Sequence, residues 1–258
     1  MSWALNELVF SKYQGAGNDF ILVDNRALDV NLTKEFIFKV CNRNYGIGAD
    51  GIILLCPSTK ASYRMRIFNS DGSEAEMCGN GIRCLYAFIL DLEELNNNDS
   101  IETLGGIYKC HMEEGRIFVQ MRLPVIEKHN ESEFFINSGV PHYVRIVEDL
   151  TEFDRQAPSL FFNHGININF VKITGPNSIM MRTFERGVES ETLSCGSGAV
   201  ASAIAAWKHT HMSGKIWVTF HSNEKMNIDL DVAEKTIRNV TLSGFARKVF
   251  CGRLSIIN

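Results

Sequence analysis

The chain contains one ordered pattern twice, and this repeat constrains its fold more than any other feature. In each copy, two β-rich runs and an acidic loop lead to a Cys-Gly-x-Gly motif, first at Cys78 and then at Cys195. The runs are Gly51–Leu55 and Tyr63–Asn69 in the first copy, and Asn167–Val171 and Ser178–Glu185 in the second. Such self-similarity within 258 residues predicts two similar halves.

Strand-like patterns predominate along the chain. β-rich or alternating runs occur at Phe20–Val23, Gly51–Cys56, Tyr63–Phe68, Ile117–Met121, Ile168–Ile173, Ile179–Phe184, Trp217–Phe220 and Met226–Val232. After each Cys-Gly-x-Gly motif the period becomes helical, with apolar residues at i, i+3, i+4 and i+7 counted from Leu85 and from Val200. The sequence therefore predicts an α/β (α+β) chain in which each of the two cysteines begins a helix.

A cysteine at a helix start is suited to proton transfer. The unpaired N–H groups and partial positive charge there favour an anion, either the thiolate itself or a bound carboxylate. A thiol whose pKa of about 8.5 is lowered toward neutrality can act as base or acid. If Cys78 and Cys195 face one substrate Cα from opposite sides, one thiolate can remove the α-proton while the other thiol delivers one.

Composition excludes several other classes of protein. The net charge is −4 without a concentrated basic segment, which argues against nucleic acid as a partner. No apolar run approaches the ~20 residues of a membrane span, and the first twenty residues lack the apolar core of a secretory signal. The seven cysteines are an odd number in scattered positions, so we expect the reducing cytoplasm and neither a disulfide framework nor a bound metal.

A packing role for the cysteines is the alternative interpretation. Free cysteine is among the most buried residue types, and glycine after a strand commonly forms a turn, so one Cys-Gly-x-Gly motif alone would favour packing. Two such motifs in repeated contexts favour function instead. The remaining cysteines lack this context and are assigned to packing: Cys41, Cys56, Cys84, Cys110 and Cys251.

Several longer motifs resemble those of a known family, the diaminopimelate epimerases, over nearly the whole chain. They are Gly15-Ala-Gly-Asn-Asp-Phe, Gly46-Ile-Gly-Ala-Asp-Gly, Arg66-Ile-Phe-Asn-Ser-Asp-Gly-Ser, Met77-Cys-Gly-Asn-Gly-Ile-Arg-Cys, Asn167-Ile-Asn-Phe-Val, Glu185-Arg-Gly and Ser194-Cys-Gly-Ser-Gly-Ala. Members of this family interconvert LL- and meso-diaminopimelate without pyridoxal phosphate.

The resemblance implies a role for each matching residue. Cys78 and Cys195 would be the catalytic pair, in agreement with the chemistry above. Gly79, Asn80, Gly196 and Ser197 would hold the substrate α-carboxylate at the two helix starts. The remaining substrate-binding positions would be Asn18, Asn69, Asn167, Glu185 and Arg186, with Arg186 pairing with the distal carboxylate. Without the resemblance, Asn18 and Asn69 would be read as turn residues and Glu185 with Arg186 as a solvated pair.

The resemblance also implies an architecture and a biological role. The expected fold has two pseudo-symmetric halves, each a mostly antiparallel sheet around a central helix, with the active site in the cleft between them. The expected domains are residues 1–126, joined by a C-terminal strand at about 247–258, and residues 127–246. The implied enzyme is a homodimeric isomerase that needs no cofactor, takes a small amino-acid substrate and serves lysine and peptidoglycan precursor synthesis.

One position departs from the family pattern. Family members usually carry Gly-Asn-Pro-His where this chain has Gly139-Val-Pro-His. The family's asparagine helps to read the distal end of the substrate, so Val140 suggests a relaxed substrate range. His142 is retained and is expected either near the site or packed in the core, with neither alternative preferred.

Four other functions compete with this one. A proline-racemase-like enzyme would share the fold and the two-thiol logic, but Asn80, Arg83 and the Glu185-Arg186 pair favour diaminopimelate. A phenazine-biosynthesis type of isomerase would lack the cysteine pair. An inactive amino-acid-binding homologue could have kept the cleft without the chemistry, but the intact Cys78 and Cys195 argue against it. A redox protein would use the two sulfurs as an exchanging disulfide.

Overall fold

The computed structural model describes residues 7–28, 30–92 and 99–255. Contacts between Cα atoms divide the chain into two units, residues 1–119 with 245–258, and residues 120–244. Domain boundaries were expected at 126/127 and near 247, and that division into domains stays a prediction.

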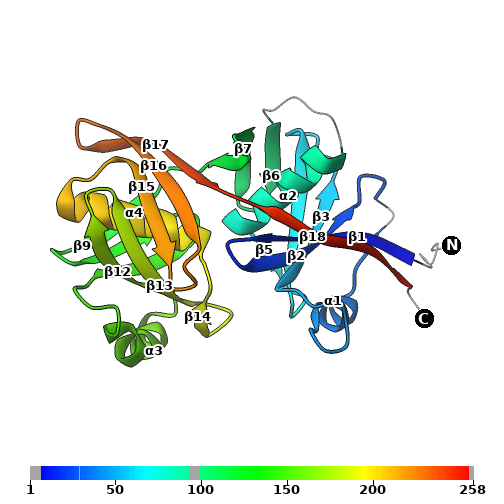
Figure 1. Cartoon of the computed structure of the whole chain (residues 1–258), viewed down its shortest axis with the longest axis horizontal. Helices are drawn as coiled ribbons and strands as arrows, with labels where there is room; N and C mark the ends of the chain where they lie inside the picture. The colour runs from blue at the N-terminus through cyan, green and yellow to red at the C-terminus, as the bar shows by residue number, and fades with distance from the viewer. Residues whose placement is uncertain (1–6, 29, 93–98, 256–258) are drawn as a thin grey trace. The chain divides into compact units, whose positions relative to one another are not determined.

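Unit 1 is built from strands with two helices (Figure 1). Its elements are β1 (Glu7–Gly15), β2 (Asn18–Asp24), α1 (Lys34–Cys41), β3 (Gly51–Cys56), β4 (Tyr63–Asn69), β5 (Glu74–Ala75), α2 (Gly79–Leu92), β6 (Asp99–Thr103), β7 (Gly106–Glu113), β8 (Arg116–Gln120, whose last residue belongs to unit 2) and β18 (Arg247–Ser255). β18 begins where the C-terminal strand was expected, and residues 256–258 of that expectation lie outside the described part.

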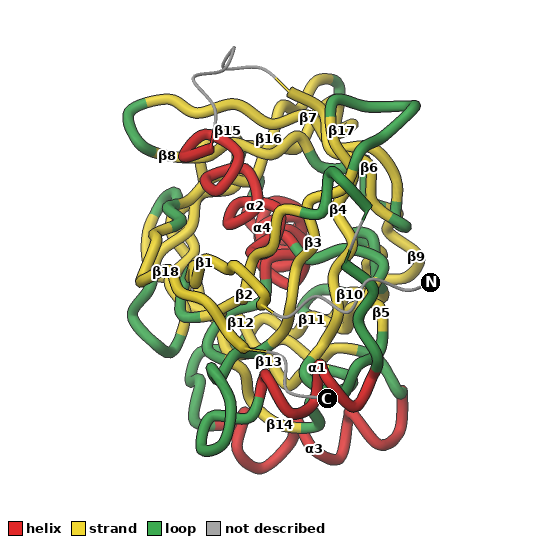
Figure 2. The backbone as a smooth tube through the Cα atoms, turned by 90° about the vertical axis from the view of Figure 1, so that its right-hand side faces the viewer, coloured by secondary structure: helices red, strands yellow, loops and turns green. Residues whose placement is uncertain are grey.

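Unit 2 has the same composition of elements. They are β9 (Val125–His129), β10 (Glu133–Asn137), β11 (Pro141–Ile146), α3 (Glu152–His164), β12 (Asn167–Gly175), β13 (Ser178–Glu185), β14 (Ser190–Thr192), α4 (Gly196–Thr210), β15 (Gly214–Phe220), β16 (Lys225–Ala233) and β17 (Thr236–Gly244). Strands are the commonest element in both units, as the tube view shows (Figure 2).

The strand pairing of unit 1 is repeated in unit 2. In unit 1, β2 runs parallel to β3, β3 antiparallel to β4, and β4 pairs antiparallel with β5 and parallel with β6. In unit 2, β11 runs parallel to β12, β12 antiparallel to β13, and β13 pairs antiparallel with β14 and parallel with β15. Antiparallel pairing also joins β1 to β2 and β18, β10 to β9 and β11, β16 to β15 and β17, and β6 to β7. This confirms the mixed α/β class and the two similar halves predicted from the repeat.

The helix after each cysteine forms the centre of its unit. In α2 every residue from Gly79 to Ile89 is buried, and in α4 every residue from Gly196 to Trp207 is buried except Ser197. A helix that is buried on all sides must be covered by other elements around its circumference. α2 contacts β1, β2, β3, β4 and β18, while α4 contacts β10–β13 and β15–β17. The expectation of a sheet around a central helix is confirmed in each half.

Candidate active-site residues

Cys78 occupies the capping position of α2. The backbone N–H of Gly81 donates to its Sγ at 3.4 Å, and its carbonyl accepts the first helical bond from Ile82 N–H at 2.8 Å. The sulfur therefore stands where a serine or aspartate oxygen would satisfy the free N–H groups of a helix start. The bond from Gly81 holds the sulfur in place, and because Cys78 is only half-buried, it remains accessible to solvent.

Two asparagines of the predicted site adjoin Cys78. The Oδ1 atom of Asn18 lies 3.7 Å from Cys78 Sγ and 3.4 Å from Asn80 Nδ2. Asn80 is buried, and its own Oδ1 accepts from Arg83 Nη2 at 3.0 Å. Arg83 is buried as well, and this burial lowers the pKa of its guanidinium. The structure thus brings Cys78, Asn18 and Asn80 together.

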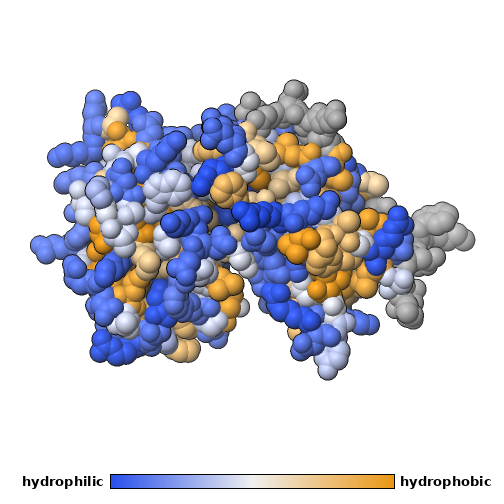
Figure 3. Space-filling view, viewed as in Figure 1, coloured by the Kyte–Doolittle hydropathy of each residue, from blue (hydrophilic) through white to orange (hydrophobic). Residues whose placement is uncertain are grey.

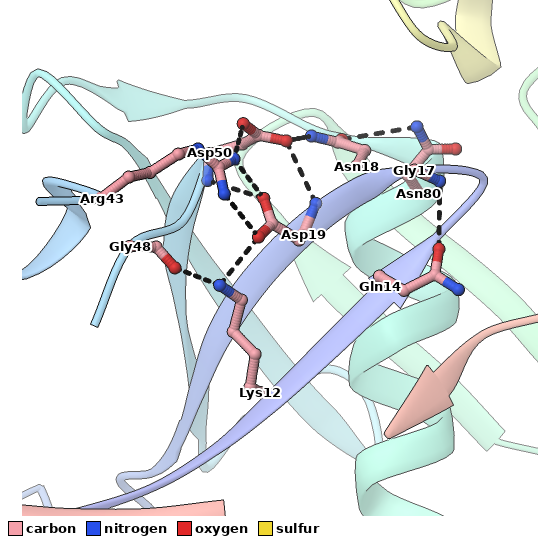
Figure 4. A network of polar contacts seen from close by, with 9 residues as sticks. All are labelled: Lys12, Gln14, Gly17, Asn18, Asp19, Arg43, Gly48, Asp50 and Asn80. Atoms are coloured by element: carbon pink, nitrogen blue, oxygen red, sulfur yellow. Dashed lines mark hydrogen bonds and ion pairs between the residues drawn. The ribbon is translucent and has the colours of Figure 1, made fainter. Parts of the chain in front are cut away.

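Asn18 is hydrogen-bonded to a network of ion pairs among Asp50, Arg43, Asp19 and Lys12 (Figure 4). Asp50 Oδ2 accepts from Asn18 Nδ2 at 2.7 Å, and Arg43 bridges Asp50 and Asp19 at 2.8 and 2.7 Å. The buried Lys12 ammonium pairs with Asp19 at 2.7 Å and also donates to the Gly48 carbonyl. Burial acts to raise the pKa of Asp19, but hydrogen bonds from Arg43 and Lys12 outweigh it and lower this pKa to about 2. The sequence motifs contained Asp19 and Asp50 without indicating that they form one network.

Asn69 ends β4, where it pairs with Gly51, the residue after Asp50. Its Nδ2 donates to Ser73 Oγ at 3.0 Å, and its backbone N–H donates to the Ser73 carbonyl at 2.9 Å. These bonds close the turn after β4. Asn69 therefore holds the turn position that the sequence also allowed, and its substrate-binding role stays a prediction.

Cys195 caps α4 in the same way as Cys78 caps α2. Gly198 N–H donates to Sγ at 3.4 Å, and the carbonyl of Cys195 accepts from Ala199 N–H at 2.9 Å. Ser197 Oγ lies 3.5 Å from Sγ. Unlike Cys78, this cysteine is buried, with 5% of its surface exposed. Both cysteines begin a helix, as the sequence predicted.

A buried chain of side chains continues from Ser197 into unit 2. Ser197 Oγ is 3.0 Å from His142 Nε2, and His142 Nδ1 is 3.0 Å from Asn169 Nδ2. Asn169 Nδ2 also donates to the Tyr143 carbonyl at 3.1 Å, and Asn169 Oδ1 accepts from Thr183 Oγ1 at 3.0 Å. Burial, with the charge of Arg186, lowers the pKa of His142 to about 3, so the imidazole is neutral near pH 7. His142 is therefore both buried and joined to the candidate site.

Asn167, Glu185 and Arg186 meet at the ends of two paired strands. Asn167 begins β12, and its Oδ1 accepts from the backbone N–H of Arg186, the residue after β13, at 2.8 Å. Glu185 Oε2 accepts from Thr192 Oγ1 at 2.9 Å. The Arg186 side chain is exposed, so its guanidinium is available to an anionic ligand.

Both central helices present a start suited to an anion. Neither α2 nor α4 carries an acidic residue in its first turn, so no carboxylate of the helix itself competes for its N–H groups. Gly79 and Gly196 are the first residues of these helices and remove side-chain bulk there. Each helix start can therefore accept a carboxylate next to its cysteine thiol.

Among the described residues, no group of three or more histidine, cysteine, aspartate or glutamate side chains is placed to hold a metal ion. None of the seven cysteines, all of which are described, forms a disulfide. Within the described part, no helix combines the length and apolar character needed to cross a membrane.

Known proteins resemble the chain in sequence and in fold. The family model "Diaminopimelate epimerase" matches residues 10–124 and 134–246. The diaminopimelate epimerase of Flavobacterium psychrophilum is 38% identical over 250 residues (93% of this chain, 97% of that protein), and that of Aquifex aeolicus is 37% identical over 274 residues (95% and 97%). The enzyme of the same name from Methanocella arvoryzae is 40% identical over 232 residues (78% and 82%).

Two solved structures share the fold. A PhzF-family phenazine biosynthesis protein of Bacillus anthracis superposes with a TM-score of 0.75 at 16% identity, covering 98% of this chain and 100% of that one. A hydroxyproline epimerase of Agrobacterium vitis with bound trans-4-hydroxy-L-proline gives 0.73 at 11% identity, with 98% and 92% covered. At these identities the structures establish the fold, while the family model and the relatives confirm the resemblance first seen in the motifs. The chain belongs to the diaminopimelate epimerase family.

Proposed function

We propose that the protein is an isomerase that interconverts LL- and meso-diaminopimelate, with Cys78 and Cys195 as the two acid–base groups. One observation carries the proposal: two cysteines in repeated contexts each cap a buried helix, and each sulfur accepts a backbone N–H of that helix. A sulfur so placed is favoured as a thiolate by the helix dipole and is held in position by the helix.

The proposed reaction needs only these two thiols. A thiolate removes the α-proton from one face of Cα, and the other thiol delivers its own proton to the opposite face. The helix starts at Gly79–Asn80 and Gly196–Ser197 bind the α-carboxylate, and their N–H groups offset the charge that develops on it as the carbanion forms. Pyridoxal phosphate has no step in this sequence.

The distal end of the substrate is assigned to the remaining predicted residues. Arg186 pairs with the distal carboxylate through its fork of donors, while Asn18, Asn69, Asn167 and Glu185 supply hydrogen-bonding groups to the rest of the substrate. The exposed guanidinium of Arg186 and the clustering of Asn167 beside it support this assignment.

The wider role follows from the substrate. We infer a cytoplasmic enzyme of lysine and peptidoglycan precursor synthesis that acts as a homodimer. Apolar side chains exposed on β1 and β18, namely Val9, Val249 and Phe250, support association through this part of unit 1. Hydrophobic residues gather on the surface where those strands lie (Figure 3).

The test uses reduced protein and LL-diaminopimelate in D2O without added pyridoxal phosphate. NMR follows deuterium at Cα, and chromatography separates the stereoisomers. We expect the meso isomer to form, and Cys78→Ala and Cys195→Ala each to lower its rate at least about a thousandfold, because each removes one acid–base group. Cys251→Ala, which removes an exposed thiol outside the motifs, serves as the matched control. Activity retained in either motif variant, or no exchange with this substrate, would reject the proposal.

A further inference from the structure

The two cysteines have matching backbone environments but opposite side-chain neighbours. On the Cys78 side, the orientation of the Asn18 amide is fixed by Asp50, because a carboxylate only accepts hydrogen bonds and must face the amide nitrogen. The amide oxygen of Asn18 is thereby directed to Cys78 Sγ and Asn80 Nδ2. An amide oxygen cannot donate, so the Asn18 oxygen can form a hydrogen bond with Cys78 only when the sulfur is protonated.

On the Cys195 side, a series of hydrogen bonds ends in a group that donates to the sulfur, whereas the group next to Cys78 accepts from that cysteine. The Tyr143 carbonyl only accepts, so the nitrogen of the Asn169 amide faces it, and the same nitrogen donates to His142 Nδ1. With Nδ1 accepting, the neutral imidazole carries its proton on Nε2. His142 therefore donates to Ser197 Oγ.

Ser197 passes this polarity on to the sulfur. Because the Ser197 oxygen accepts the hydrogen bond from His142 Nε2, the Ser197 hydroxyl group can donate its own hydrogen bond to Cys195 Sγ, 3.5 Å away. Together with Gly198 N–H at 3.4 Å, two donors then converge on Cys195. Hydrogen bonds donated to the charged form stabilise that form, so this surrounding favours a thiolate.

Charged groups near the two cysteines act alongside these hydrogen bonds. Arg83 interacts electrostatically with Cys78 and favours its thiolate, against the effect of Asn18, whereas Arg186 acts on His142. Near Cys78, the Asp19 and Asp50 carboxylates are neutralised by Lys12 and Arg43. The Cys84 thiol stays neutral because burial raises its pKa, and in unit 2 the Glu185 carboxylate is bonded to Thr192.

We propose that Asp50 and Asn169 are positioning residues that place the proton of the resting enzyme on Cys78 and leave Cys195 as the thiolate. Asp50 acts through Asn18, and Asn169 acts through His142 and Ser197. The inference rests on the two-thiol function proposed above and adds to it the protonation state from which a turnover begins.

This state has a consequence for the reaction cycle. The Cys195 thiolate takes the α-proton and Cys78 gives up its own, so a turnover ends with a thiol at Cys195 and a thiolate at Cys78. The resting state returns when Cys195 releases its proton to solvent and Cys78 takes one up. The free enzyme is therefore ready for the stereoisomer that presents its α-proton to Cys195.

The experiment measures the two thiols directly, without substrate. The reduced full-length protein is alkylated with iodoacetamide over a pH series, and peptide mass spectrometry gives the rate at each cysteine. The pH midpoint of each rate reports thiolate formation. The greater burial of Cys195 acts to raise its midpoint, against the hydrogen bonds from Ser197 and Gly198 that lower it. We expect the midpoint of Cys195 to lie about one pH unit or more below that of Cys78, the size expected of one charge-assisted hydrogen bond.

Variants then separate the two positioning residues. Asp50→Ala should lower the midpoint of Cys78 by about one unit and leave Cys195 unchanged. Asp50→Asn removes the charge but keeps an accepting oxygen, so it should shift Cys78 less. Asn169→Leu should raise the midpoint of Cys195 alone. Matched controls are Glu74→Ala, which removes a carboxylate paired with Arg66 in unit 1, and Asn227→Leu, which removes a buried asparagine of β16 in unit 2.

The outcomes keep this inference separate from the function. A wild-type midpoint of Cys78 equal to or below that of Cys195 overturns it, even if a variant fails to fold. If Asp50→Ala or Asn169→Leu shifts the alkylation midpoint no more than its control variant does, the positioning role of that residue is rejected. The alkylation experiment uses no substrate. Failure to epimerise diaminopimelate would therefore contradict the proposed function, whereas only the alkylation midpoints test the protonation states of the two cysteines.

Discussion

Val140 is the residue at which this chain departs from the family pattern. Its side chain is half-buried and directly precedes β11, two positions before His142. An apolar side chain there cannot hydrogen-bond a polar distal group, whereas the asparagine usual in the family can. We predict that Val140→Asn narrows the substrate range, lowering kcat/KM for other acidic amino acids about tenfold relative to diaminopimelate. The measurement is a comparison of kcat/KM over a panel of amino acids, with Val140→Leu as the apolar control, and an unchanged range would contradict the prediction.

Single residues also show where sequence reasoning stops. Cys78 and Cys195 could be predicted because their motifs recur, and Asn18 and Asn80 because they lie in family motifs. Asp50 and Asn169 lie within the family motifs, but nothing in the sequence assigned them a role of their own, and Thr183 lies outside those motifs. Asp50 bonds Asn18, which is 32 positions away along the chain, and Thr183 bonds Asn169, which is 14 positions away. Amide orientation and histidine tautomer depend on those partners, so they appear only once the fold brings the side chains together.

Helices α2 and α4 begin with the same Gly-x-Gly pattern but tolerate a methyl group differently. A Cβ on Gly198 would lie 2.6 Å from Asn169 Oδ1 and 3.2 Å from Cys195 Sγ, whereas one on Gly81 would meet the flexible ends of Ile67 and Ile53 at 3.0 and 3.1 Å. We therefore predict that Gly198→Ala lowers kcat/KM about 10- to 100-fold by displacing Asn169 or the sulfur. Gly81→Ala should cost much less. Steady-state kinetics of the two variants checks this, and equal losses would count against it.

Whole elements were predictable to different degrees. Strands β2, β3, β4, β8, β12, β13, β15 and β16 and the two central helices were predicted from their patterns, whereas the buried strands β1 and β11 were not. Helix α3 was not, although Phe153, Ala157 and Phe161 form a buried stripe at helical spacing. Pro158 inside that segment argues against a helix, since proline lacks the N–H that an interior turn requires. The buried contacts of the stripe with Phe170 and Phe184 belong to the tertiary fold and are not visible in local sequence.

At the scale of the whole molecule, one connectivity occurs twice and supplies one thiol from each unit. The parallel and antiparallel pairings around α2 are the same as those around α4. A two-base inversion uses one acid–base group on each face of the stereocentre, and a duplicated half can supply one such group from each copy. The central claim is therefore that the proton removed from Cα and the proton delivered to it belong to different sulfurs.

Isotope content at the initial rate of epimerisation tests this claim most directly. LL-diaminopimelate is incubated with the enzyme in D2O, and the first product and the remaining substrate are separated and analysed by mass spectrometry. Two thiols predict deuterium at the inverted centre of the meso product and protium in the recovered LL substrate, because the delivering sulfur has exchanged with solvent. Product that retains the substrate's own proton, or substrate that gains deuterium as fast as product forms, would show a single base and contradict the account.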